Sequence, residues 1–235
     1  MTKKIICLVR FFKTEDRRAA FLRGDLYMNR LKFFKEYEEQ NGSSVGDKHE
    51  GSCGWHQPGT VELTIKNNDT GEEYVIKDFA SPLSMGLARH NEYHVYCMSA
   101  VYFDDELTYK TFEDRKSYMT LDVESADLGD YCAIVPAREF FERLDKGLMA
   151  AAQASDIMGR GLVEYFDPGT FSGSFEGDQA IMRKRNCFSH QKEYRIFAYN
   201  GTSGKNARTI QIGDLTDIAE CCDKKDFHKT LIITN

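Results

Sequence analysis

The sequence predicts an α+β fold: a single domain over residues 1–235, built mainly from antiparallel mixed sheets with peripheral helices. Short runs rich in β-branched and aromatic residues recur along the whole chain, separated by Gly, Pro and Asn turns. No repeat, low-complexity tract or linker divides the chain. The composition, 41% hydrophobic and 29% charged, is that of an ordinary globular protein with a sizeable core.

The N-terminal part predicts two strand–helix pairs followed by a long loop. Thr14 suits a helix N-cap, acidic residues follow it in the first turn, and Gly24 suits the position after the helix. Residues 40–59 are rich in Gly, Ser and charge without periodicity, and such a loop inside a compact domain is often functional. The expected elements are strands at 5–12 and 25–29 and helices at 15–23 and 31–39.

The middle of the chain begins with a hairpin signal. The run Asn67–Gly71 reads Asn-Asn-Asp-Thr-Gly and lies between two strand-like segments. Further on, Thr111 and Asp114 have the spacing of a capping box, which predicts a helix from there to about residue 119. Pro136 ends a buried strand, and an amphipathic helix follows it. The expected strands are 60–65, 73–79, 93–101, 131–135 and 157–166, and the expected helices are 111–119 and 137–148.

The C-terminal part centres on residues 187–200, which begin polar and end as an alternating aromatic and aliphatic run typical of a strand. Glu193 stands where the polar part meets this strand, behind the basic segment 183–185. The remaining expected elements are short helices at 178–185 and 215–222 and strands at 207–212 and 229–234.

Charge and motif content exclude several classes of protein. A net charge of −6 argues against a general nucleic-acid coat, because phosphate affinity comes mainly from clustered Lys and Arg. Seven cysteines form no disulfide framework, no signal peptide is visible and no segment is long enough to span a membrane. A cytoplasmic protein with reduced thiols is the simplest interpretation. The glycine-rich dinucleotide motif, the P-loop and the His-Glu-x-x-His motif are all absent.

The long loop carries two candidate metal sites. His49, Cys53 and His56 are possible soft-metal ligands, although structural zinc prefers four ligands at tighter spacing, so a solvated loop is the simpler interpretation. Asp47, His49 and Glu50 offer hard ligands of the kind found in a metal-dependent nuclease. Neither pattern is strong enough to predict a bound metal.

A Cys/His nucleophile pair is a further alternative. Cys187 and His190 are near neighbours in the sequence, but such a pair needs proximity of the two side chains in space. The sequence cannot show that proximity.

A more informative set is spread along the chain: Arg10 in the first strand, Ser99 in a middle strand, and Gln191 and Glu193 at the start of a late strand. An arginine inside an apolar strand needs an anion, and a pyrophosphate accepts its planar fork bidentately. A carboxylate can stabilise the positive charge that grows on a sugar ring as an N-glycosidic bond breaks. The set therefore predicts a nucleotide site.

The order of these residues resembles the Arg–Ser–Glu group of mono-ADP-ribosyltransferases. The resemblance implies that the protein uses NAD as substrate and modifies a macromolecular acceptor, protein or nucleic acid, in bacterial toxicity or phage–host conflict. Glu193 would be catalytic, Gln191 would orient the acceptor, Arg10 would bind the cofactor and Ser99 would support the site. The chain departs from the family where Met98-Ser99-Ala100 replaces Ser-Thr-Ser.

A second resemblance covers most of the chain. Gly24–Tyr27, the acidic loop at 46–51, Cys97–Ser99 and the late Glu-Tyr-Arg strand are similar to features of a broad group of uncharacterised bacterial proteins. This likeness implies little about activity.

Two non-enzymatic interpretations stay open. In the structural one, Arg10 pairs with Asp25 or Glu38, Ser99 is a small core residue, and Glu193 forms a surface pair with Arg195. In the other, the chain is an interaction protein, such as a phage-defence or counter-defence factor, that binds a partner through aromatic residues at 33–37.

Overall fold

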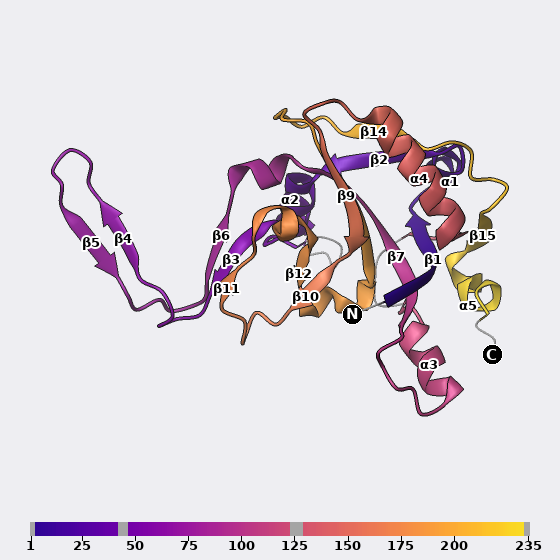
Figure 1. Cartoon of the computed structure of the whole chain (residues 1–235), viewed down its shortest axis with the longest axis horizontal. Helices are drawn as coiled ribbons and strands as arrows, with labels where there is room; N and C mark the ends of the chain where they lie inside the picture. Colours follow the sequence, from indigo (N-terminus) through magenta and orange to yellow (C-terminus); the bar gives the residue numbers. More distant parts are fainter. Residues whose placement is uncertain (1–2, 42–46, 123–128, 233–235) are drawn as a thin grey trace.

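The computed structural model describes residues 3–41, 47–122 and 129–232. Helices and antiparallel sheets are mixed along the chain, which confirms the α+β class (Figure 1). The α-helices are α1 (Glu15–Leu22), α2 (Leu31–Asn41), α3 (Phe112–Met119), α4 (Ala137–Ala151) and α5 (Phe227–Thr230). Short 3₁₀ helices are η1 (Ala88–Glu92), η2 (Gly177–Met182), η3 (Asn186–Gln191) and η4 (Lys224–Asp226).

Within the described residues, the strands form one large sheet and three small ones. Those of the large sheet are β1 (Lys3–Phe12), β2 (Asp25–Arg30), β7 (His94–Asp104), β8 (Tyr131–Pro136), β9 (Ile157–Leu162), β13 (Glu193–Tyr199), β14 (Arg208–Gln211) and β15 (Glu220–Asp223). Those of the small sheets are β3 (Ser52–His56), β4 (Leu63–Lys66), β5 (Glu73–Ile76), β6 (Leu83–Gly86), β10 (Glu164–Phe166), β11 (Gly173–Ser174) and β12 (Arg183–Arg185).

The long strand β7 organises the large sheet. Its neighbours are β1 and β2 along one edge and β13 along the other, all antiparallel, and β13 in turn pairs with β9. The registers place Val9 of β1, Ser99 of β7 and Glu193 of β13 in one row across the three strands. Because directly opposite residues in antiparallel strands share a face, these three side chains lie on the same side of the sheet.

The two faces of the large sheet carry different layers. On one face α1 and α4 pack through Phe21, Phe140 and Leu144 onto strand residues such as Leu8 and Tyr96. On the other face, Phe197 of β13 packs with Leu31 of α2, Tyr93 next to η1 and Ile181 of η2. The row that contains Glu193 belongs to this second face.

Several expected elements are confirmed by their local contacts. The Thr14 hydroxyl accepts from the Arg17 N–H at the start of α1. Thr111 and Asp114 make both hydrogen bonds of a capping box at the start of α3. The hairpin signal at 67–71 joins β4 and β5, and the amphipathic helix after Pro136 is α4.

Other expected elements are wrong. Residues 215–222 form a turn and then β15, because pairing with the open edge of β8 outweighs local helix propensity. The expected strand at 229–234 begins with the helix α5, and residues 233–235 lie outside the described part. The long loop at 40–59 contains β3, and residues 42–46 of it are outside the described part. The expected helix at 178–185 is η2 followed by β12.

The expected strand at 157–166 is two strands, β9 and β10. They are separated at Val163, whose N–H donates to the Glu193 carbonyl oxygen at 2.9 Å. The break sends β10 to pair with β12, beside the start of β13.

The turn after α1 leads to a stability prediction. Gly24 has φ +90°, and a Cβ there would collide with the Gly213 carbonyl oxygen. Gly24→Ala is therefore expected to lower the free energy of unfolding by about 2–3 kcal/mol in urea denaturation. Gly86→Ala is the matched control, since its Cβ would meet nothing within 4 Å, and it should change stability by less than about 0.5 kcal/mol. Equal effects of the two changes would contradict the prediction.

Membrane insertion through a helix finds no support in the described residues: none of their helices combines the length and apolarity needed to cross a bilayer.

Candidate functional site

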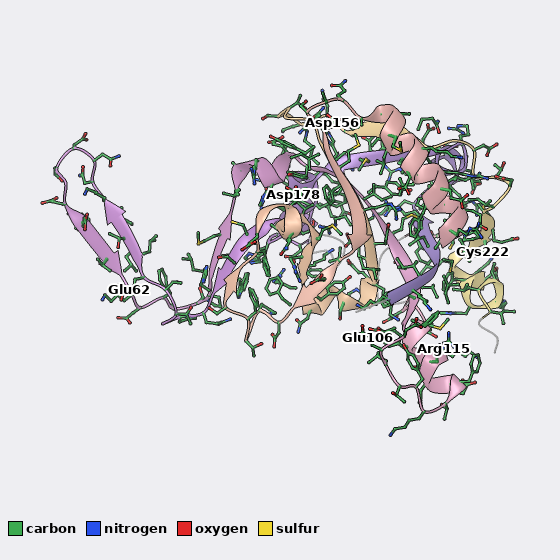
Figure 2. The ribbon with its side chains drawn as sticks, viewed as in Figure 1. Glu62, Glu106, Arg115, Asp156, Asp178 and Cys222 are labelled. Carbon is green, nitrogen blue, oxygen red and sulfur yellow. The ribbon has the colours of Figure 1, made fainter. Side chains whose placement is uncertain are left out.

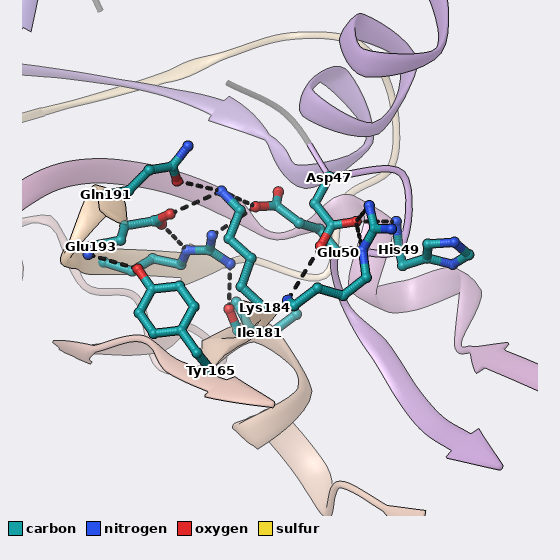
Figure 3. Close-up of polar contacts among 10 residues, drawn as sticks. Asp47, His49, Glu50, Tyr165, Ile181, Lys184, Gln191 and Glu193 are labelled. Atoms are coloured by element: carbon teal, nitrogen blue, oxygen red, sulfur yellow. Dashed lines mark hydrogen bonds and ion pairs between the residues drawn. The ribbon is translucent and has the colours of Figure 1, made fainter. Parts of the chain in front are cut away.

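Four charged side chains lie buried together beneath the second face of the large sheet (Figure 3). They are Glu50, Lys184, Glu193 and Arg195, and each is between 0 and 4% exposed. With two carboxylates and two cations, the group is formally neutral. We call these four residues the buried quartet.

Three separate segments supply the quartet. Glu193 and Arg195 are alternate residues of β13 and so point to the same face. Lys184 is the middle residue of β12, and Glu50 belongs to the turn before β3. The quartet therefore ties the small sheets to the large one.

Arg195 is the centre of the quartet. Its Nε donates to Glu193 Oε1 at 2.6 Å and its Nη2 to Glu50 Oε1 at 2.9 Å, while its Nη1 donates to the Ile181 carbonyl oxygen at 2.5 Å. Lys184 Nζ lies 3.1 Å from Glu50 Oε1 and 3.2 Å from Glu193 Oε2. Each Glu193 oxygen thus has a cation of its own.

The backbone at Lys192 brings Gln191 and Glu193 to the same cation. Lys192 has φ +42°, in the left-handed region that non-glycine residues rarely adopt. Ala100 N–H donates to its carbonyl oxygen at 2.8 Å, which anchors this turn on β7. As a result, Gln191 Oε1 accepts from Lys184 Nζ at 2.8 Å, beside the Glu193 contact.

Electrostatics hold the quartet in its charged form. Burial alone would raise the pKa of Glu193, but Arg195 and Lys184 outweigh burial and hold that pKa well below its usual range. Burial alone would lower the pKa of Lys184, but Glu193 and Glu50 raise it above its ordinary value. The pKa of Arg195 rises for the same reason. Glu193 is therefore ionised at neutral pH.

A second ion pair lies beside the quartet. Asp47 is buried and accepts from Arg185 Nε at 3.0 Å and from the His49 N–H at 2.9 Å. Near β13, the Glu193 N–H donates to the Tyr165 hydroxyl at 2.9 Å. These contacts fix the loop before β3 and the strand β10 around the buried charges.

Of the residues proposed from sequence, Ser99, Gln191 and Glu193 come together and Arg10 does not join them. Ser99 stands directly opposite Glu193 in the β7–β13 register. Arg10 lies between Leu8 and Phe12, which pack on the helix-covered face, and its guanidinium lies over the Tyr96 ring at 4.9 Å.

The structural interpretation of these residues is only partly met. Arg10 donates to the Cys97 carbonyl oxygen, whereas Asp25 lies near Arg23 and accepts from Gln211. Glu193 and Arg195 do pair, but inside the protein rather than on its surface. The side chain of Glu38 is outside the described part.

The candidate metal ligands have other partners. Among the described residues, no group of three His, Cys, Asp or Glu side chains could hold a metal ion. Asp47 and Glu50 instead accept from Arg185 and Arg195. His49 stacks edge-on against Trp55, with ring centroids 5.0 Å apart.

The proposed Cys/His pair does not meet through its thiol. The ring contact that His190 makes with Cys187 is to the backbone carbonyl oxygen of that cysteine, at 3.1 Å.

A pocket of about 350 Å³ lies beside β12 and β13, a volume near the lower end for small-molecule sites, and none of the four quartet residues lines it. Phe197 of β13 forms one wall, on the same face as Glu193 and Arg195. Met182 and Arg183 form another, between the Ile181 carbonyl that Arg195 contacts and Lys184. Glu164 and Asp178 add carboxylates to the lining.

Sequence reasoning missed Lys184 and Arg195 as members of the site. Lys184 stands in a basic run that looked solvent-facing, and only the tertiary packing of β12 buries it. Arg195 did carry a signal, since a charged residue among aromatic and aliphatic strand residues needs an anion inside the protein.

Comparison with known proteins offers no further guide to the site. No protein-family model, no curated protein and no solved structure matches this chain.

Proposed function

We propose that the protein is an NAD-dependent mono-ADP-ribosyltransferase in which Glu193 is the catalytic carboxylate. The observation that carries the proposal is the convergence of three of the four motif residues. Ser99 faces Glu193 across β7 and β13, and Gln191 and Glu193 meet at Lys184. The strands bearing the arginine, the serine and the glutamate are also neighbours in the sheet.

In this proposal Glu193 acts as a fixed negative charge. Cleavage of the bond between nicotinamide and ribose passes through an oxocarbenium-like state, and an ionised carboxylate near the ring stabilises it. The cations that lower the pKa of Glu193 keep it ionised for this task. Gln191 would orient the acceptor, and Ser99 would support the carboxylate from the neighbouring strand.

The contacts of Glu193 imply that the site opens before it acts. Arg195 holds Oε1 and Lys184 holds Oε2, so a ribose hydroxyl must displace one cation to reach the carboxylate. Each cation also has two other acceptors, but the Lys184 contact with Glu193 is the longer, 3.2 Å against 2.6 Å for Arg195, so Lys184 is the one to leave. Arg10 has no part in this scheme, because it faces the helix layer.

The test is label transfer from NAD. Wild-type protein incubated with adenylate-labelled NAD and a cell lysate should transfer label to protein or nucleic acid, and Glu193→Gln should reduce transfer at least about 100-fold. Glu142→Gln is the matched control, since that carboxylate lies on α4, is 60% exposed and belongs to neither the quartet nor the pocket lining, and it should keep activity. Ser99→Ala leaves every ion pair intact and should reduce transfer by about tenfold, the effect of losing one hydrogen bond in the transition state. Absence of label transfer by folded wild-type protein, or full transfer by Glu193→Gln, would contradict the proposal.

A second candidate function is favoured by the hairpin formed by β4 and β5, which projects from the body of the molecule (Figure 1). All eight strand residues of this arm are exposed. The register puts Leu63 opposite Ile76 and Ile65 opposite Tyr74, so one face of the ribbon is apolar. An isolated two-stranded hairpin is marginally stable in water, and an exposed apolar patch typically marks an interaction site.

The charges of the arm indicate which partner it fits. Residues 62–78 hold five carboxylates and two lysines, a net charge of −3 out of −6 for the whole chain. Two ion pairs, Glu62–Lys77 and Lys66–Glu73, involve both lysines and leave the remaining carboxylates in excess. We therefore propose that the arm binds a protein whose apolar surface is bordered by Lys and Arg.

Paired substitutions on the arm test this second function. Ile65→Ser with Tyr74→Ser should weaken partner binding at least about 100-fold, and binding by wild type should weaken as salt is raised. Thr64→Ser, on the opposite face, is the control. The partner is captured by cross-linking, identified, and accepted only if its cross-links map to residues 62–78. Concentration-dependent dimerisation lost in the double variant, or binding to anionic vesicles, would overturn the assignment.

A further inference from the structure

Two cysteines face each other at the C-terminal edge of the large sheet. Cys132 of β8 stands directly opposite Cys222 of β15 in antiparallel register, and both thiols are free. Opposite residues in such strands have Cα atoms about 4.5–5.5 Å apart. Disulfides span Cα separations of about 4.4–6.8 Å, so the backbone already meets this requirement.

The two side chains lie on the same face of the sheet, because directly opposite residues in antiparallel strands share a face. Cys222 packs against the buried cluster that contains Cys132. Cys132 is fully buried among Phe11, Phe227 and their neighbours, whereas Cys222 is half-buried. Figure 2 labels Cys222 at the edge strand β15. An oxidant in solution therefore meets Cys222 first and reaches Cys132 only through it.

We propose that Cys132 and Cys222 are a modification site that forms a reversible cross-strand disulfide with oxidants of the disulfide class, such as glutathione disulfide. The Cys222 thiolate attacks one sulfur of glutathione disulfide, forms a mixed disulfide and releases one glutathione. Cys132 then attacks the Cys222 sulfur, its proton passes to the departing thiolate, and a second glutathione leaves. Two protein thiols lose two electrons and two protons, which reduce the oxidant to two glutathione molecules.

The geometry makes the pairing selective. Cys221 is adjacent in sequence, but alternate strand residues point to opposite faces, and Cys221 stands opposite Ala133. Burial raises the pKa of the Cys132 thiol, so Cys132 favours the role of second partner over first attack. The bond would fasten β15, and with it α5, to the large sheet. Phe227 of α5 already packs on Phe11 there, with ring centroids 5.6 Å apart.

The test is thiol mapping on the native full-length chain. After oxidation by glutathione disulfide and unfolding in denaturant, Cys132 and Cys222 should both resist alkylation, and digestion should yield a peptide linked through Cys132 and Cys222. The midpoint of thermal unfolding should rise by about 5 °C or more and return on reduction. Cys221→Ser should keep the linked peptide and Cys222→Ser should lose it.

Three outcomes would overturn the proposal: seven free thiols after oxidation, linkage of Cys222 to Cys221 or to another chain, or a linked peptide that forms only after denaturation. Because the readout does not involve NAD, it is independent of whether Glu193 is catalytic.

Discussion

Arg195→Met is expected to lower the free energy of unfolding by about 3–5 kcal/mol, the range for breaking a buried ion pair by removing one partner. Methionine fills much of the volume but leaves Glu193 and Glu50 with Lys184 as the remaining quartet cation. The Ile181 carbonyl oxygen also loses its donor. Urea denaturation monitored by circular dichroism measures the change.

A rescue variant shows that charge, rather than packing, is responsible. Adding Glu193→Gln to Arg195→Met restores neutrality in the quartet and should recover at least about 1 kcal/mol. Arg138→Met removes a solvent-exposed ion pair with Glu142 and should change stability by less than about 0.5 kcal/mol. If Arg195→Met and Arg138→Met lower the free energy of unfolding by the same amount, the quartet contributes no stability and the prediction is wrong.

Stability is expected to fall in two steps on acidification. Burial lowers the pKa of His90 and of His94 from the usual 6.5, although a ring N–H of each donates to a backbone carbonyl oxygen, which acts in the opposite direction. As the pH falls, these two histidines therefore become protonated at a higher pH in the unfolded chain than in the folded chain. The contribution of His90 and His94 to the free energy of unfolding is fully present above about pH 6.5 and is lost as the pH falls through their lower folded-state pKa values.

The second loss of stability, at lower pH, comes from the protonation of Glu193. Its folded-state pKa lies below the usual 4.5, so its contribution is present above about pH 4.5 and is lost as the pH falls through that lower value. Each histidine contributes a slope of up to about 1.4 kcal/mol per pH unit within its window.

Urea denaturation at pH values from 8 to 3 checks both steps. His90→Gln should flatten the upper step, and the rescue pair Arg195→Met with Glu193→Gln should flatten the lower one. A free energy of unfolding that stays constant from pH 7 to pH 4 would contradict the account.

The elements that could be predicted from the sequence are those fixed by local chemistry. The Thr14 cap, the Thr111–Asp114 capping box and the turn at 67–71 carry their signals within a few residues. The errors fall where distant strands decide the structure. Residues 220–223 become a strand because β8 offers them an open edge, and that edge is invisible in the local sequence.

The candidate site shows the same contrast between features that local sequence predicts and features that tertiary packing decides. The start of β13 at Glu193 and the nearness of Gln191 follow from sequence spacing. The face on which Arg10 lies could not be predicted, because a shift of one residue in register reverses it. The burial of Lys184 depends on how β12 packs against the large sheet, which no pattern in residues 183–185 reveals.

The most direct test of the central claim is nicotinamide release from NAD by the purified protein. Wild type is predicted to bind NAD and release nicotinamide slowly without an acceptor, while Glu193→Gln, checked for folding, should release it at least about 100-fold more slowly. Wild-type protein that neither binds NAD nor releases nicotinamide would contradict the claim that Glu193 is a catalytic carboxylate.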